Sequence, residues 1–373
     1  MTLSPVFRSP EAVRLLEEKG VWERLGPAME AQARAVNTLY EDLGNLMDPR
    51  FLQEGSRVPE AGEMRSAEGL GFLQEYFFLI LFRSLFESLG VSPQRLAFYT
   101  ELNFCIKGTI TAADNIFDDQ AKSLLPLAEG SGSRFLSILQ LMSFERLVRR
   151  SCDRAAEAGV ITAADTHAIL RGLLNRMGEI GRLEGSEEGG VDEIPTPDAM
   201  VRRVHEVRGG ALFALAFVAP GILEEGGVGE AFRETEPAIA RLGTAFQIVD
   251  DLTDFEFDLG RKSHNLLVSQ IHHGGSAEEK GTLGELWAGG PVPEGIVEGL
   301  FRASARAVLE RAYEEAQGSF QRLAELGYWF PAELAPEVVH AIVGLEGVAR
   351  MEAIASGGGM SPRFPTISLP KSR

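Results

Sequence analysis

Two clusters of acidic residues have the spacing of metal ligands on helices. In the first, Asp114 and Asp118 are four residues apart, and Asp119 follows directly. Carboxylates at positions i and i+4 lie on one helical face, where their like charges repel unless a cation bridges them. Lys107 and Thr111 continue the same polar stripe on an otherwise apolar segment. This pattern predicts a helix that lines a wet cavity.

The second acidic cluster is longer. Asp250, Asp254 and Asp258 are spaced at i, i+4 and i+8, and Gln247 lies one turn earlier on the same side. Their neighbours are strongly apolar, so three carboxylates on this face would be costly without bound metal or cationic partners. Hard oxygen ligands suit Mg²⁺, which typically bridges protein carboxylates to substrate phosphates. We therefore predict a magnesium site for a phosphorylated substrate.

A simpler interpretation exists for each cluster alone, because aspartate pairs at this spacing are common on solvated helices. The two clusters, however, each end a long apolar segment, and roughly 130 residues separate them. We therefore expect them to face one another. The histidines lack cysteine or histidine partners at ligand spacing, which argues against a zinc site.

Composition excludes several classes of function. The formal net charge of −18 argues against a nucleic-acid partner, which would need a concentrated basic patch. The two cysteines, Cys105 and Cys152, and the absence of a signal-like start predict a cytoplasmic protein. The apolar stretch 69–90 is interrupted by charges and is too short to span a membrane. We expect a buried helix there and no stable membrane insertion.

The elements that position the clusters are predicted to be helices, because apolar residues recur at three- and four-residue spacing and alternating runs are nearly absent. The chain is therefore expected to be all-α. An acidic, Gly-rich loop is predicted at 184–197 and a second loop at 272–294. We expect a single domain over residues 1–355 and a flexible tail over 356–373. The predicted helical segments are 10–48, 69–90, 95–118, 134–158, 162–183, 198–224, 230–258, 296–326 and 332–356.

Several strings resemble motifs of the class I isoprenoid synthases, in the branch of the trans-polyprenyl diphosphate synthases. Phe246 to Asp254 looks like the family's second aspartate motif, FQxxDDxxD, and Asp114 to Asp118 looks like its first, DDxxD, with Asn115 in place of the second acid. The segment from Arg208 to Phe213 is similar to the Lys-Thr-Gly-x-Leu segment. The resemblance covers roughly residues 65–270 in the right order. It implies a single large helical bundle with a central cavity, and a homodimer.

The resemblance also implies roles for particular residues. Three Mg²⁺ ions and a prenyl diphosphate would be held between the two aspartate helices. Arg208 and Lys262 would donate to the diphosphate; Arg261 and Arg203 are further candidates, for which a surface position is the preferred interpretation. The metal ligands would be Asp114, Asp118, Asp119, Asp250, Asp254 and Asp258, of which Asp114, Asp118, Asp250 and Asp254 would be catalytic. The cavity would be lined by Phe77, Phe104, Lys107, Thr111, Phe213, Phe246 and Gln247, although most of the 22 phenylalanines are expected to fill the core.

Two departures from the family pattern point to cyclisation. Glu75, Tyr76 and Phe78 stand where chain-elongating synthases carry cations for isopentenyl diphosphate, and Ser123 and Leu124 replace an Arg-Arg pair after the first motif. A terpene cyclase needs only one diphosphate site and an apolar chamber. We therefore predict a terpene synthase that ionises a linear prenyl diphosphate and releases diphosphate.

Three alternatives remain open. The first is a prenyltransferase with unusual co-substrate binding, including irregular coupling. The second is a catalytically inactive homologue that regulates a partner synthase. The third is a metal-binding helical bundle outside isoprenoid chemistry, which the string from Phe246 to Asp254 disfavours.

Overall fold

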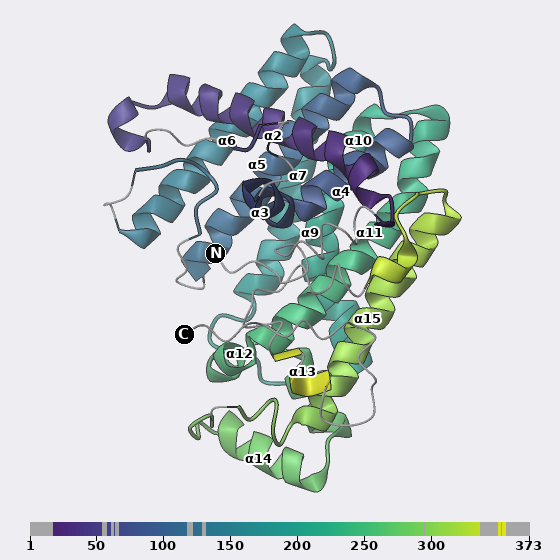
Figure 1. The fold of residues 1–373 in the computed structure, drawn as a ribbon. Helices are drawn as coiled ribbons and strands as arrows, with labels where there is room; N and C mark the ends of the chain where they lie inside the picture. The colour runs from purple at the N-terminus through teal and green to yellow at the C-terminus, as the bar shows by residue number, and fades with distance from the viewer. Residues whose placement is uncertain are drawn as a thin grey trace.

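The protein is helical throughout the part that the computed structural model describes (Figure 1). No strand occurs among these residues; one isolated antiparallel bridge joins Leu52 to Leu127. The all-α prediction is confirmed. Asp118, Asp119 and the predicted tail 356–373 lie outside the described residues. The described ranges are 18–53, 58–60, 63, 67–117, 122–128, 132–293, 295–335, 350–351 and 353–355.

The N-terminal half is built mainly from long helices. The predicted segment 69–90 is split at Tyr76 into two helices, of which the second buries Phe77, Phe82 and Phe86. Helix α5 carries the first aspartate cluster at its C-terminal end and lies against α6. The helices of this half are α2 (Val21–Leu46), α3 (Ala67–Glu75), α4 (Phe77–Ser88), α5 (Pro93–Phe117), α6 (Ser133–Glu157) and α7 (Ala163–Gly185), with a 3₁₀ turn η2 (Pro49–Phe51).

The predicted helix 198–224 is helical but changes type along its length. A π-helix, η4 (Val201–Gly210), makes up its central part, and such wide turns are frequent at functional sites. It is preceded by α8 (Pro197–Met200) and followed by α9 (Ala211–Ala214), a 3₁₀ turn η5 (Leu215–Phe217) and α10 (Val218–Leu223). Among the described residues, this stretch alone is long and apolar enough to cross a membrane, yet 56% of its apolar window is buried inside the protein. It therefore has the burial of a core helix.

The C-terminal half centres on α11 (Gly226–Thr253), which lies beside α15 (Arg302–Glu325) and η4 (Figure 1). The prediction of one continuous helix over 230–258 was wrong, because the chain breaks at Asp254 and continues as α12 (Phe255–Arg261). The predicted loop 272–294 was wrong as well. It contains the end of α13 (Leu266–Gly274) and all of α14 (Ala277–Trp287). A short 3₁₀ turn, η6 (Ala332–Leu334), follows α15.

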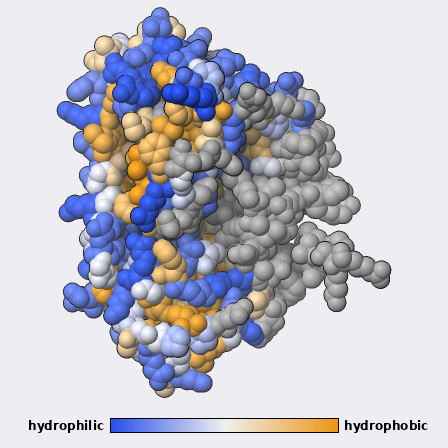
Figure 2. All heavy atoms as spheres, turned by 90° about the vertical axis from the view of Figure 1, so that its left-hand side faces the viewer, coloured by the Kyte–Doolittle hydropathy of each residue, from blue (hydrophilic) through white to orange (hydrophobic). Residues whose placement is uncertain are grey.

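One cluster of buried side chains runs through both halves, from Val21 on α2 to Ile354 near the end of the described chain. The face shown in Figure 2 carries hydrophilic residues with apolar patches between them. Helix α6 exposes Phe135, Ile138 and Met142, which are spaced as one helical face. The core thus joins the helices that bear the two aspartate clusters into one body.

Candidate active site

The first aspartate cluster lies at the C-terminal end of α5. Asp114 is exposed there, while Thr111 and Lys107 are half-buried one and two turns earlier. The three side chains therefore follow the predicted stripe from the protein interior toward the surface. Asp118 and Asp119 belong to the undescribed residues that follow Phe117, so their predicted metal contacts stay predictions.

Asn115, which replaces the second acid of the first motif, holds a loop in place. Its side chain is buried; Nδ2 donates to the carbonyl of Lys122 at 2.7 Å, and Oδ1 accepts from the Lys122 amide at 3.1 Å. Gln140 on α6 fixes the same loop, because its Oε1 accepts from the amide of Leu124 at 2.7 Å. A carboxylate could not donate to the carbonyl. These hydrogen bonds explain why position 115 carries an amide side chain rather than a carboxylate.

The second cluster keeps its predicted spacing across the helix break. The amide of Asp254 donates to the carbonyl of Asp250 at 2.9 Å, and the amide of Asp258 donates to that of Asp254 at 2.9 Å. Burial raises the pKa of Asp258 to about 8. Burial also raises the pKa of Asp250 well above its ordinary value, and nearby carboxylates raise it further. These groups are costly as anions unless a cation neutralises them.

The two aspartate clusters lie close together. The charge of Asp114 on α5 is among the causes that raise the pKa of Asp250 on α11, although 136 positions separate them in the chain. Arg261 joins α12, which follows α11 and carries Asp258, to the end of α5, since its Nη1 donates to the carbonyl of Phe117 at 3.3 Å. Thr111, Asp114 and Asp250 are therefore on neighbouring elements.

Lys122 is a cation of this site that the sequence analysis did not identify. Its positive charge lowers the pKa of Asp250, which places it near the second cluster. The loop that carries it is fixed by Asn115 and Gln140. The side chain is exposed and so remains accessible to an anionic ligand. The sequence signal was a lysine directly before Ser123, the first of the two positions where the resemblance expected arginines.

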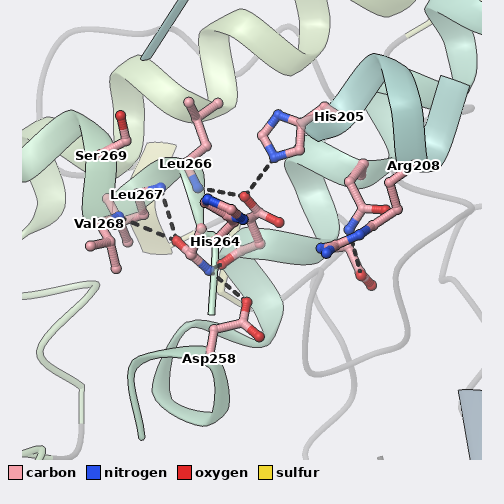
Figure 3. Close-up of polar contacts among 12 residues, drawn as sticks. His205, Arg208, Asp258, His264, Leu266, Leu267, Val268 and Ser269 are labelled. Carbon is pink, nitrogen blue, oxygen red and sulfur yellow. Dashed lines mark hydrogen bonds and ion pairs between the residues drawn. The ribbon is translucent and has the colours of Figure 1, made fainter. Parts of the chain in front are cut away.

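Asp251 organises the buried side of the motif, next to His205 and Leu266 (Figure 3). Its Oδ2 lies 2.8 Å from Nε2 of His205, which is fully buried on η4, and accepts from the amide of Leu266. Asn265 connects Asp251 to the second aspartate cluster, because its Nδ2 donates to the Asp251 carbonyl at 2.7 Å and to Asp258 Oδ2 at 2.8 Å. His205 thus has a structural hydrogen bond inside the protein.

Arg208 is buried on η4 beside the acidic loop (Figure 3). Its guanidinium pairs with Glu184 and, at 2.5 Å, with Glu187 Oε1. The charges of Asp251 and Asp258 also raise the pKa of Arg208, although burial opposes this. Arg208 therefore lies between the loop and the second cluster. Its pairing with two glutamates was not predicted, because the loop and the helix meet only in the folded chain.

Glu187 joins this loop to the segment after α12. It accepts from the amide of His264 at 3.0 Å, and its Oε1 lies 2.7 Å from Nδ1 of the same residue. Burial opposes ionisation of Glu187, but the bond with His264 and the charge of Arg208 prevail and lower its pKa. The carboxylate therefore stays charged and ties the loop down beside the motif.

The other predicted diphosphate donors lie further out. Lys262 adopts a left-handed conformation with φ of 55° after α12, its carbonyl accepts from the amide of Val191 at 2.9 Å, and its ammonium lies 5.9 Å from the ring centre of Trp287. Arg261 lies over the Phe257 ring and bonds to α5. Arg203 is exposed on η4. For Arg203 and Arg261 the exposed position agrees with the preferred interpretation.

Three half-buried aromatic rings from different helices meet beside the second cluster. Phe213 lies 4.6 Å from Phe78 on α4 and 5.8 Å from Phe246 on α11, measured between ring centres. Gln247, next in the chain, donates from Nε2 to Asp250 Oδ2 at 3.2 Å. Phe78 stands at a position where chain-elongating synthases carry a cation. In this protein it is one of the three aromatic rings.

Phe77 and Phe104 lie deeper than the three rings. Phe104 is fully buried against Tyr40, Tyr76 and Phe144, and Phe77 packs against Phe330. Both residues thus contribute to the core around the site.

Lys107 is neutralised within the protein. Its ammonium lies 2.7 Å from Oε1 of Glu75, bonds to the Glu75 carbonyl, and sits 4.7 Å from the ring centre of Tyr76. Burial lowers the pKa of Lys107. This wall of the site therefore presents a balanced ion pair rather than a free cation.

No set of three or more acidic, histidine or cysteine side chains in the described part of the chain surrounds a common point as a ready metal site. The donor type nevertheless fits Mg²⁺, which keeps several waters and usually takes one or two carboxylates together with phosphate oxygens. The raised pKa values of Asp250 and Asp258 also favour neutralisation by a cation. Asp114, Asp250, Asp254 and Asp258 are the described residues that would hold it.

No protein-family model matches the chain, and no curated protein matches it. Solved structures do match. A decaprenyl diphosphate synthase from Rhodobacter capsulatus is 18% identical, with 86% of this chain and 99% of that chain covered and a TM-score of 0.50. An octaprenyl pyrophosphate synthase from Helicobacter pylori is 15% identical, with coverages of 82% and 99% and a TM-score of 0.51. The chain therefore has the class I isoprenoid synthase fold, the all-helical fold of the polyprenyl diphosphate synthases.

Proposed function

We propose that this protein is a magnesium-dependent enzyme that ionises a prenyl diphosphate, and that it cyclises or rearranges the resulting cation as a terpene synthase. The observation that carries the proposal is the proximity of Asp114 to Asp250, since it brings two acidic helix faces from distant parts of the chain to one site. A diphosphate with Mg²⁺ would neutralise both faces at once.

The residues would have different roles according to where they lie in the site. Asp114 would hold metal from α5, while Asp250, Asp254 and Asp258 would hold it from the other side. Bound Mg²⁺ would stabilise the negative charge that develops on the departing diphosphate. Lys122 and Arg208 would donate hydrogen bonds to phosphate oxygens. For Arg208 this requires Glu184 or Glu187 to release part of the guanidinium.

Ionisation breaks the bond between the allylic carbon and the diphosphate oxygen, and the electron pair leaves with the diphosphate. The allylic cation that remains needs surroundings that exclude water and stabilise positive charge. The rings of Phe78, Phe213 and Phe246 would provide such a surface, because aromatic faces attract cations and Phe246 lies about one helical turn before Asp250 on α11. Loss of a proton or capture of water would then end the reaction.

The Glu75–Lys107 pair favours cyclisation over chain transfer. Transfer requires a second diphosphate, isopentenyl diphosphate, to bind beside the first. Lys107 already has Glu75 as its counter-ion, and the positions after the first motif offer Lys122 alone. One diphosphate therefore has cationic partners here, whereas a second has few.

A prenyltransferase is the second candidate, and the solved structures with this fold favour it, since both are prenyl diphosphate synthases. The purified protein should be incubated with Mg²⁺ and C10 to C25 prenyl diphosphates, with and without isopentenyl diphosphate, and the products identified by mass spectrometry. A hydrocarbon or terpene alcohol formed without isopentenyl diphosphate supports the terpene synthase. A longer diphosphate supports the transferase, and no product with any substrate contradicts both.

A further inference from the structure

The C-terminal end of the described chain contacts the second aspartate cluster through one side chain. Nη1 of Arg350 donates to the carbonyls of Leu252 at 2.8 Å and Thr253 at 3.3 Å. Both terminal nitrogens also pair with Glu256, at 2.9 and 2.7 Å, and Nε pairs with Glu298 at 2.8 Å. The side chain of Arg350 is only 18% exposed. It therefore makes a dense, partly buried set of contacts.

These contacts complete the hydrogen bonding at the end of α11. The last four carbonyls of a helix have no partner within it. Here the carbonyl of Asp250 accepts from the amide of Asp254, and that of Asp251 accepts from Asn265. Arg350 supplies donors to the remaining two carbonyls, at Leu252 and Thr253. Its positive charge also opposes the partial negative charge at the helix end.

Arg350 bonds to the residues on both sides of the helix break at Asp254. Its carbonyl partners end α11, which carries Asp250, while Glu256 belongs to α12, which follows Asp254 and carries Asp258. A guanidinium that bonds both sides at once restricts the angle between the two helices. That angle sets how far apart the carboxylates of Asp250, Asp254 and Asp258 lie.

We infer that Arg350 is a positioning residue for the metal-binding carboxylates of the second cluster. The inference rests on the proposed function, because it assumes that these carboxylates bind Mg²⁺. Arg350 bonds to the backbone of α11 and to Glu256 and Glu298, so it would act on the metal through the position of the aspartates. It acts by holding α11 and α12 at the angle at which Asp250 and Asp254 can share ions with the diphosphate.

The chain offers a matched control for simple docking of the C-terminal segment. Nη2 of Arg306 on α15 donates to the carbonyl of Ala355 at 2.9 Å, so it anchors the same segment from another helix than α11 and α12. Met351 and Ile354 anchor the segment by burial. A residue that only docks the segment should behave like Arg306.

The test measures binding of Mg²⁺ together with inorganic pyrophosphate by titration calorimetry on the full chain. Loss of a group that orients metal ligands typically weakens metal affinity about 10- to 100-fold, and we expect this for Arg350→Met. Arg306→Met should stay within about twofold of the wild type. Arg350→Lys should recover part of the affinity, since it keeps the charge but cannot bond both helices at once. Glu256→Gln, which removes the ion pair and keeps an acceptor, should weaken binding as well.

Each outcome of the titrations supports or overturns the positioning role of Arg350. Wild-type affinity in folded Arg350→Met, or equal losses in Arg350→Met and Arg306→Met, would overturn the positioning role while leaving the proposed function intact. If Arg350→Met does not fold, Glu256→Gln and Arg350→Lys decide, and wild-type affinity in both overturns the role. If the wild-type protein itself binds no Mg²⁺ with pyrophosphate, the proposed function fails and the positioning role fails with it.

Discussion

Lys107 and Glu75 form an ion pair at 2.7 Å between α5 and α3, on the wall of the site that leads toward Asp114. Both side chains are largely buried, at 28% and 20% exposure. The pair removes a free positive charge from this wall, and Tyr76 covers the ammonium from another side. Under the proposed function, this pair is the feature that favours a site for one diphosphate over a site for two.

We predict strong coupling within this pair. Lys107→Met leaves Glu75 partly buried without its cation and should lower the free energy of unfolding by about 1–3 kcal/mol. Glu75→Gln keeps an acceptor for Lys107 and should cost less. The double variant should recover much of the loss. Urea denaturation of the three variants gives the coupling energy, and additive effects would show that the pair contributes nothing specific.

The two aspartate clusters should both be required for turnover. Asp250→Ala or Asp114→Ala removes a metal ligand and should lower turnover on the order of 100-fold or more, because charge stabilisation on the leaving group is lost. The helical circular-dichroism spectrum should not change. Asp153→Ala, on the outer part of α6, is the matched control and should stay active. Full activity in both site variants would refute the metal assignment.

Placing an acid at position 115, as in the motif that this segment resembles, should harm the protein. Asn115→Asp removes the donor to the Lys122 carbonyl and places a buried carboxylate against that oxygen. We expect a loss of about 1–3 kcal/mol in the free energy of unfolding. Because the loop also carries Lys122, kcat/KM should fall rather than rise. Chemical denaturation and steady-state kinetics on the same sample check both statements, and a more active variant would contradict the structural role of Asn115.

The contact between η4 and α11 should tolerate no side chain at Gly243. An added Cβ there would lie 2.2 Å from the carbonyl oxygen of Gly209 and 2.9 Å from the ring of Phe213. Gly243→Ala should therefore cost about 1–3 kcal/mol of stability. Gly178→Ala on α7 is the control, since its Cβ meets nothing within 4 Å, and it should gain about 0.5–1 kcal/mol from helix propensity. Equal thermal shifts for the two variants would contradict the close packing.

The stability of the metal-free protein should fall as the pH rises. Burial and the charge of Asp251 raise the pKa of Asp258 from 3.8 to about 8. Between these values the folded protein holds a proton that the unfolded chain has released, so raising the pH disfavours folding. The loss should be complete above pH 8. Magnesium with pyrophosphate should restore stability at high pH, because it takes the place of the proton.

Thermal unfolding between pH 5 and pH 8.5, with and without magnesium and pyrophosphate, measures this dependence. Asp258→Asn should flatten the metal-free profile, because the amide does not titrate. Asp192→Asn, exposed in the acidic loop, should leave the slope as in the wild type. A metal-free protein whose stability is the same in Asp258→Asn and wild type at every pH would contradict the raised pKa.

The sequence predicted the helices and the two acidic faces because both depend on local spacing. Apolar periodicity located α5 and α11, and the four-residue intervals placed Asp250, Asp254 and Asp258 on one side. The break at Asp254 was not predicted, because apolar residues continue through it in phase. Its stabilising partner, Arg350, lies about 100 positions later, and no local pattern connects them.

Other features depended on contacts that form only in the folded chain. The pairing of Arg208 with Glu187 joins a loop to a π-helix, and the role of Asn115 depends on the loop at Lys122. Helix α14 was different, because its signal was present. Ser276 and Glu279 form a capping box, but the surrounding glycines and prolines were given more weight.

The near-contact between Gly209 and Gly243 has a consequence for how the site meets its ligand. Arg208 and Gln247 lie next to the point where η4 and α11 cross. Because the two backbones touch there without intervening side chains, they hold Arg208 and Gln247 at a constant separation. That half of the site is assembled before any ligand arrives. Little of the binding energy of an anionic ligand would then be consumed in ordering the backbone, and the remaining cost on this side is to free the Arg208 guanidinium from Glu184 or Glu187.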